Sequence, residues 1–142
     1  MLISTETISV RYAETDQMGV VYHANYLVWC EIGRTKLSEE LGFKYADMEK
    51  KGVLSPVTNI QMNYRSPARY GEDVTIRTWI EKYNGFRLTY GYEIQDDSGK
   101  VCAEATSEHV CVNAETFRPF SLKKHFPEWH EAYEANKKKP EV

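Results

Sequence analysis

Helical periodicity dominates one long segment of this 142-residue chain, and most of the remainder alternates as β-strands do. Between residues 24 and 41 the apolar positions recur mostly every three or four residues, which places them on one helical face. Gly42 follows as a helix stop. Gly33 inside a helix costs about 1 kcal/mol relative to Ala, so we expect a neighbour packed tightly against it. The apolar helical face comprises Tyr26, Leu27, Cys30, Gly33, Leu37 and Leu41.

Five segments alternate with the two-residue period of strands, at residues 6–12, 58–64, 74–80, 87–94 and 101–113. Asn84-Gly85 is a strong hairpin signal between the third and fourth of them. Residues 122–133 have helical spacing of their large apolar side chains. The pattern predicts a single α+β domain over residues 1–142, with an antiparallel five-stranded sheet wrapped around the long helix and a short C-terminal helix. The uncovered edges of such a sheet favour dimerisation.

Composition narrows the possible partners. A net charge of -3 argues against nucleic acid or an anionic membrane as the main partner. No apolar run approaches the ~20 residues of a membrane span, and no signal peptide opens the chain. Three cysteines without a C-x-x-C pair fit buried thiols in a reducing compartment, so we expect a cytoplasmic protein.

A carboxylate stands in a loop directly before the predicted helix. Asp16 lies in YAETDQMGVVYHANYL, residues 12–27, between the first strand and the helix. Free backbone N–H groups and the positive end of the helix dipole favour an anion or a polarised carbonyl oxygen there. A base or nucleophile beside such a site is the minimum needed to attack an activated acyl group. Taken alone, Asp16 could equally be a turn or capping residue.

The surrounding residues resemble a known family. The stretch YAETDQMGVVYHANYLVWCEIGR, residues 12–34, resembles the hotdog-fold acyl-CoA thioesterases, near 4-hydroxybenzoyl-CoA thioesterase and its YbgC-type relatives. The stretch YRSPARYGE, residues 64–72, matches the connection between the second and third strands of that family. The D-x-x-G-x-x-x-x-x-N-Y core, residues 16–26, is the most specific part of the match.

The resemblance implies a hydrolase that cleaves an acyl-CoA thioester to free acid and coenzyme A. Asp16 would act as nucleophile or as general base on water, and the backbone N–H of His23 would polarise the thioester carbonyl. Family sites lie at a dimer interface, and dimers commonly pair into tetramers. No metal or other cofactor is implied, because coenzyme A is part of the substrate.

Further candidates carry two interpretations each. The His23 imidazole could steer the substrate or be structural, and Tyr12 could hydrogen-bond the site or be a core ring. Asn25 and Tyr26 should anchor the helix entry, with Asn25 bonding loop backbone, and Gly19 is the glycine of the motif. The acyl pocket or the core would take Met18, Val21, Tyr22, Met62 and Tyr64.

Basic residues are candidates for the coenzyme A phosphates, although most should be ordinary solvated charges. The benzoyl-type member of the family has consecutive basic residues at the hairpin where this chain has only Lys82 and Arg87 flanking the turn. We therefore expect nucleotide contacts that differ or are weaker. The candidates are Arg65, Arg69, Lys82, Arg87 and Lys100.

Motifs of other chemistries are absent from the sequence, and two rival functions remain possible for a hotdog fold. The chain has no G-x-S-x-G elbow and no glycine-rich phosphate loop, and His125 and His130 are poorly spaced for one metal on a helix. One rival is a hotdog hydratase or dehydratase, whose His and carboxylate pair does not match the Asp16 loop. The other is a non-catalytic acyl-CoA sensor, which would not need Asp16.

Overall fold

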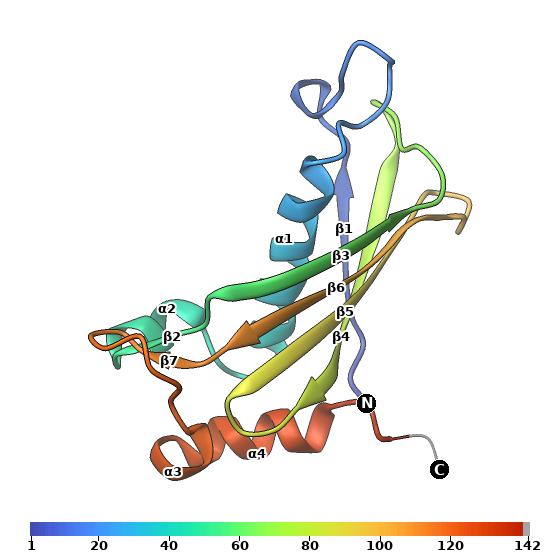
Figure 1. Ribbon diagram of the computed structural model, residues 1–142. Helices are drawn as coiled ribbons and strands as arrows, with labels where there is room; N and C mark the ends of the chain where they lie inside the picture. The colour runs from blue at the N-terminus through green and yellow to red at the C-terminus, as the bar shows by residue number, and fades with distance from the viewer. Residues whose placement is uncertain (141–142) are drawn as a thin grey trace.

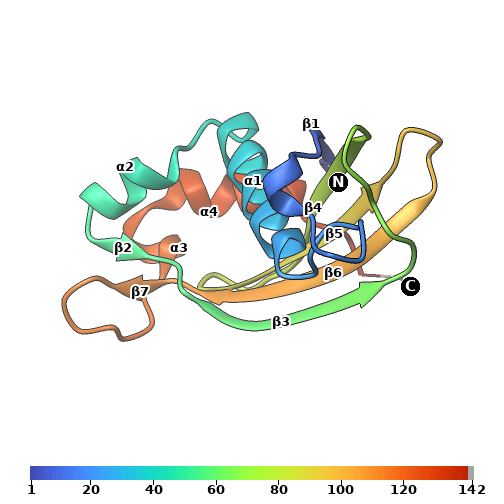
Figure 2. The ribbon, with the colours of Figure 1, turned by 90° about the horizontal axis from the view of Figure 1, so that it is seen from above.

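The computed structural model describes residues 1–140 and contains a five-stranded antiparallel sheet with one long helix on its concave side (Figures 1 and 2). The helix, α1, spans Asn25–Glu40. The strand order is β1-β4-β5-β6-β3, so the strands at the two edges are β1 and β3. The predicted α+β arrangement is confirmed. The strands are β1 (Ser4–Ser9), β3 (Val57–Tyr64), β4 (Asp73–Tyr83), β5 (Arg87–Gln95) and β6 (Val101–Val110).

Several short elements were not predicted. The segment expected as one strand over 101–113 is two strands, because β7 (Val112–Asn113) leaves the main sheet and pairs with β2 (Val53–Leu54). The helix α2 (Tyr45–Lys50) precedes β2. The C-terminal helical segment is divided into α3 (Leu122–His125) and α4 (Pro127–Asn136). Proline disfavours helical geometry in the residue before it, and Phe126 accordingly has φ -138 and ψ 68.

Gly33 is where α1 approaches the sheet most tightly. A Cβ added at Gly33 would lie 2.3 Å from Thr78 Oγ1 and 2.9 Å from Ile76 Cγ2, both on β4. The tight neighbour predicted for this glycine is therefore confirmed. The helix packs mainly on β1 and β4, and the buried face of α1 includes Trp29, which the sequence pattern did not place there. Leu27 was expected in that face but is 38% exposed.

The two edges of the sheet differ from its centre. The inward residues predicted on β4 and β5 are buried, which confirms the alternation in those strands. On β3 the alternation does not produce a buried face, because the strand is exposed along nearly its whole length and only Met62 is half-buried. This leaves apolar Val57, Ile60 and Tyr64 uncovered at the β3 edge.

The first strand is shorter than predicted. It ends at Ser9, and Tyr12 begins the 3-10 helix η1 (Tyr12–Glu14). The expectation that Tyr12 is a core ring is wrong, because Tyr12 is 77% exposed and packs edge-on against Tyr70. The alternation that predicted a longer strand continues past the point where the chain turns toward α1.

Candidate active site

The loop between β1 and α1 lies beside the loop between β3 and β4 at one end of the molecule (Figure 1). Backbone hydrogen bonds join them, since Val10 N donates to Glu72 O at 2.9 Å and Val21 N donates to Ala68 O at 2.9 Å. The Tyr26 hydroxyl on α1 accepts a hydrogen bond from Ala68 N. The second loop therefore supports the loop that carries Asp16.

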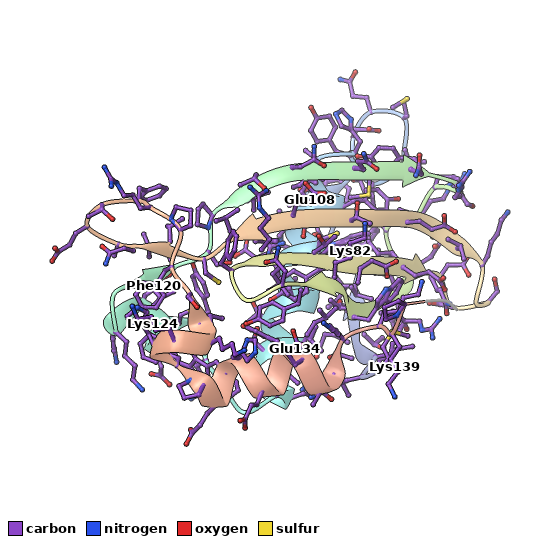
Figure 3. The ribbon with its side chains drawn as sticks, turned by 60° about the horizontal axis from the view of Figure 1, so that its bottom comes forward. Lys82, Glu108, Phe120, Lys124, Glu134 and Lys139 are labelled. Atoms are coloured by element: carbon purple, nitrogen blue, oxygen red, sulfur yellow. The ribbon has the colours of Figure 1, made fainter. Side chains whose placement is uncertain are left out.

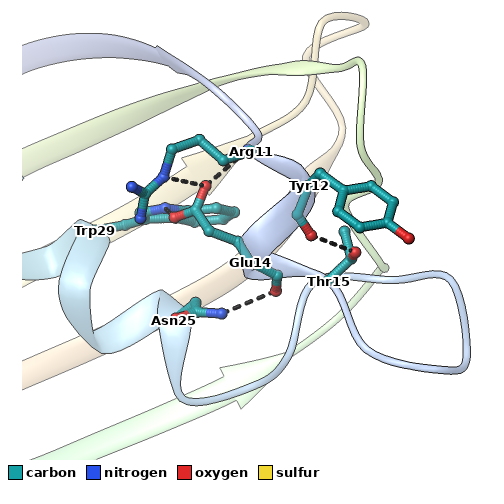
Figure 4. Close-up of polar contacts among 6 residues, drawn as sticks. All are labelled: Arg11, Tyr12, Glu14, Thr15, Asn25 and Trp29. Carbon is teal, nitrogen blue, oxygen red and sulfur yellow. Dashed lines mark hydrogen bonds and ion pairs between the residues drawn. The ribbon is translucent and has the colours of Figure 1, made fainter.

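A buried carboxylate joins the first loop to the helix (Figure 4). Glu14 is 4% exposed, and its two carboxylate oxygens accept from Arg11 N and Trp29 Nε1, each at 2.8 Å. Its backbone oxygen accepts from Asn25 Nδ2 at 2.8 Å, so the prediction that Asn25 bonds loop backbone is confirmed. The side chain of Arg11 approaches the same carboxylate from solvent, with Nε 3.5 Å from Oε1. Buried charges persist when paired and hydrogen-bonded in this way.

Asp16 occupies a tight turn. Its Oδ1 accepts from Met18 N at 2.8 Å, and its backbone N–H donates to Val20 O at 2.9 Å. Gly19 closes the turn with φ +77, a conformation that L side chains rarely adopt. Asp16 therefore acts as a turn residue, one of the roles expected for it. The turn uses only its Oδ1, and the other carboxylate oxygen has no hydrogen-bond partner among the residues described.

The entry to α1 leaves two backbone donors free. The amides of Asn25, Tyr26 and Leu27 bond to the carbonyls three residues before them. The N–H groups of His23 and Ala24, in contrast, donate to no protein group within residues 1–140. Tyr64 fixes this turn, because its hydroxyl donates to His23 O at 3.1 Å. Burial raises the pKa of Tyr64, which keeps the hydroxyl a donor.

Asp16 and His23 border one cavity of about 300 Å³. Asp16, the N-terminal end of α1 and His23, whose backbone amide is unpaired, therefore lie around a common space, and the other unpaired amide belongs to the next residue, Ala24. Such an arrangement can hold a carbonyl oxygen on the amides while an oxygen nucleophile approaches its carbon. The other residues that line it are Met18, Val20, Val21, Tyr26, Tyr64, Arg65, Ser66 and Pro67.

Several predicted site residues do not line this cavity. Tyr12 is exposed on the far side of η1 from the core, and Tyr22 is exposed with its ring 4.4 Å from the His23 ring. Gly19 and Asn25 act through the backbone of the loop, as described above. The four basic candidates other than Arg65 do not line the cavity either. Arg69 lies in the loop between β3 and β4, and Arg87 lies at the β4–β5 hairpin.

Basic residues of that hairpin line a second cavity. Lys82 and Arg87 line a cavity of about 280 Å³ together with Glu108 of β6. The side chains of Lys82 and Glu108 lie on the face of the sheet opposite α1 (Figure 3). Within one chain Lys82 and Arg87 do not line the Asp16 cavity, whereas Arg65 does.

Glu14 and Trp29 were missed by sequence reasoning. A Glu in a loop is normally a solvated charge, and no spacing rule links it to a tryptophan fifteen residues later. Among residues 1–140, no group of three or more His, Cys, Asp and Glu side chains is arranged to hold a metal ion. No helix in the same range is long and apolar enough to span a membrane.

Comparisons with known proteins show the family of this chain. A family model described as "Thioesterase-like superfamily" matches residues 10–131. The "Putative acyl-CoA thioesterase YneP" of Bacillus subtilis (strain 168) is 58% identical over 97% of this chain and 100% of its own length. The "Acyl-CoA thioester hydrolase YbgC" of Escherichia coli O157:H7 is 30% identical over 82% of this chain and 87% of its own.

A solved structure gives the same result for the fold. The crystal structure of "DHNA-CoA Thioesterase from Staphylococcus aureus" superposes with a TM-score of 0.92 at 46% identity, covering 95% of this chain and 91% of that one. The chain therefore belongs to the thioesterase-like superfamily, among its hotdog-fold acyl-CoA thioesterases.

Proposed function

We propose that this protein hydrolyses an acyl-CoA thioester to a free acid and coenzyme A in the cavity bordered by Asp16 and His23. The observation that carries the proposal is that Asp16 borders the same cavity as His23, whose backbone N–H is unpaired, as is that of the adjoining Ala24. The thioester carbonyl oxygen would rest on the His23 and Ala24 amides. Asp16 would attack the carbonyl carbon, or remove a proton from a water that attacks it. The C–S bond then breaks and coenzyme A leaves as a thiolate that takes up a proton. Where Asp16 itself has attacked, a water then hydrolyses the acyl–Asp16 anhydride and releases the free acid.

The rate contributions of a positioned base and of oxyanion donors are large enough to account for thioester hydrolysis. A positioned base typically contributes about 100- to 10,000-fold. Loss of one oxyanion donor typically costs about 100- to 1,000-fold. The backbone donors do not depend on the His23 side chain, so in this mechanism the imidazole has a secondary role.

Arg65 is the basic side chain best placed to contact the coenzyme A moiety. It lines the cavity of Asp16, and its partner Glu104 is a surface carboxylate at 3.3 Å. Surface ion pairs of this type contribute little and exchange readily. Arg69, Lys82, Arg87 and Lys100 remain candidates for the phosphates at greater distance.

We also propose that the active form is a homodimer that uses the β3 edge. The outer backbone edge of β3 pairs with no strand within residues 1–140. Apolar side chains on this unpaired edge are exposed, a combination that marks an interface. They are Val57, Ile60 and Tyr64 on β3.

The test is a panel of acyl-CoA substrates, with release of free thiol followed by a disulfide reagent. The panel contains short-chain, medium-chain, benzoyl and 1,4-dihydroxy-2-naphthoyl thioesters, the last because relatives carry that name. We expect stoichiometric thiol and acid from at least one substrate. Tight binding without thiol release would point to a sensor, and conversion of an unsaturated acyl group without thiol release to a hydratase. Either result would refute the proposed reaction.

A further inference from the structure

A third cavity, separate from the two described above, lies under the other half of α1, away from Asp16. It has a volume of about 160 Å³ and shares no lining residue with the Asp16 cavity. Helices α1, α2 and α4 are grouped over this end of the sheet (Figure 2). The volume is about ten times the ~15 Å³ that one water needs, so a small organic molecule fits. Its lining includes Arg34, Ser38, Met48, Tyr90, His109 and Tyr133.

Arg34 brings an unpaired positive charge to this cavity. Its side chain is half-buried, yet no Asp or Glu oxygen within residues 1–140 lies within 4.0 Å of it. Glu31 also lines the cavity but is exposed and forms no ion pair with Arg34. A partly buried guanidinium normally has an anionic partner, because removing the charge from water is costly.

The buried polar groups beside Arg34 are neutral and hydrogen-bonded among themselves. His109 is 3% exposed, and burial lowers its pKa to about 4, with the Arg34 charge acting in the same direction. Its Nδ1 lies 3.3 Å from Ser55 O and must donate to that carbonyl, so Nε2 accepts from Ser107 Oγ at 2.8 Å. Tyr92 donates to the same Ser107 oxygen at 2.6 Å. No carboxylate within residues 1–140 therefore neutralises Arg34 by direct contact.

The other residues that line the cavity determine the chemical class of ligand that it can bind. Phe43 and Met48 form an apolar side, and burial raises the pKa of Tyr90, whose hydroxyl stays a neutral donor. A guanidinium binds a carboxylate with two parallel hydrogen bonds. The exposed Glu31 at the rim disfavours a dianion such as phosphate. Arg34 and Lys44 together with Glu31 give the lining a net charge of +1, and with the neutral donors and the apolar wall this suits a small monocarboxylate.

We propose that the cavity between α1, α2 and α4 binds a small organic acid through Arg34. The acid's carboxylate pairs with the guanidinium, and its hydrocarbon part lies against Met48 and Phe43. The site is separate from the proposed thioester chemistry, so its test requires no turnover.

Benzoate is the probe, and benzamide is its uncharged counterpart of nearly the same shape. Methionine methyl groups labelled with ¹³C report the location, because Met48 lines this cavity whereas Met18 lines the Asp16 cavity. We expect benzoate to shift the Met48 resonance saturably and to leave Met18 unchanged. Benzamide and the Arg34→Gln variant should each require at least tenfold more ligand. Arg118→Gln, which removes an exposed arginine elsewhere, should bind as the wild type does.

Three results would overturn the assignment. They are equal saturation of Met48 by benzoate and benzamide, benzoate binding that is unchanged in a folded Arg34→Gln variant, or a shift of Met18 with Met48 unmoved. Absence of any Met48 shift with millimolar benzoate would do the same. The comparison of benzoate with benzamide uses the wild type alone, so the test stands even if Arg34→Gln fails to fold.

Discussion

Glu14→Gln should weaken both the stability of the fold and the proposed catalysis, although Glu14 does not line the Asp16 cavity. The carboxylate accepts from Trp29 Nε1 and from Arg11 N, each at 2.8 Å. Hydrogen bonds to a charged group contribute about 1.5–3 kcal/mol each. Gln keeps one oxygen acceptor but turns an NH₂ group toward the other donor. We therefore expect a loss of about 2–3 kcal/mol in the free energy of unfolding.

The same change should reach Asp16 through the loop. Glu14 holds η1 against α1, and a displacement of about 1 Å in a reacting group can cost 100-fold in rate. We expect kcat on the best acyl-CoA to fall at least tenfold while the protein remains folded. Urea unfolding followed by far-UV circular dichroism gives the stability, and thiol release gives kcat.

A double-mutant cycle with Trp29→Phe isolates the interaction. Phe removes the indole donor, so its own cost and that of Glu14→Gln should not add. The coupling between the two changes should be about 1–2 kcal/mol. Strict additivity, or a Glu14→Gln variant with wild-type stability and kcat, would show that this carboxylate does not hold the loop.

Three further predictions follow from the geometry. Gly33→Ala should lower the free energy of unfolding by about 1–3 kcal/mol in urea titration, because the new Cβ meets Thr78 Oγ1; stabilisation by the ~1 kcal/mol of helix propensity would contradict the packing. His23→Ala keeps the backbone donor, so kcat for acyl-CoA hydrolysis should fall less than about tenfold; a loss of the order of 100-fold would assign the imidazole a direct role. Ile60→Lys at the β3 edge should shift sedimentation velocity from dimer to monomer, whereas Gln61→Lys, on the opposite face, should not; a dimer that survives Ile60→Lys would place the interface elsewhere.

The long helix and the central strands were predictable because their signals are local. The three- and four-residue spacing over 24–41 reproduces α1 at Asn25–Glu40 within one residue at each end. The close contact at Gly33 was predictable from the cost of a glycine inside a helix. Strands β4 and β5 are covered on one face, so their alternation reports burial directly.

The failures depend on contacts between distant residues. Alternation in β3 resembles that of a half-buried strand, yet β3 is an exposed edge, and only its neighbours in space decide that. Glu14 is buried because Trp29 comes to it from α1, which no pattern around Glu14 records. Arg34 meets His109 beside a cavity closed by α2 and α4, and α2 itself was not predicted.

The site was predictable in part. The motif placed Asp16 and His23 near one another, and both border the same cavity. The motif indicated the backbone N–H of His23 but not the unpaired amide of Ala24 beside it, because which amides the opening turn of α1 uses is seen only in the structure. It also could not separate Arg65, which lines the cavity, from Arg87, which lies at the distant hairpin.

The steady-state kcat of Asp16→Asn on the best acyl-CoA substrate tests the central claim most directly. The amide oxygen of Asn can still accept from Met18 N, so the turn is preserved while the anionic oxygen is lost. We predict a loss of kcat of at least about 100-fold, with an unchanged urea midpoint. A folded Asp16→Asn enzyme that releases thiol at close to the wild-type rate would contradict the mechanism.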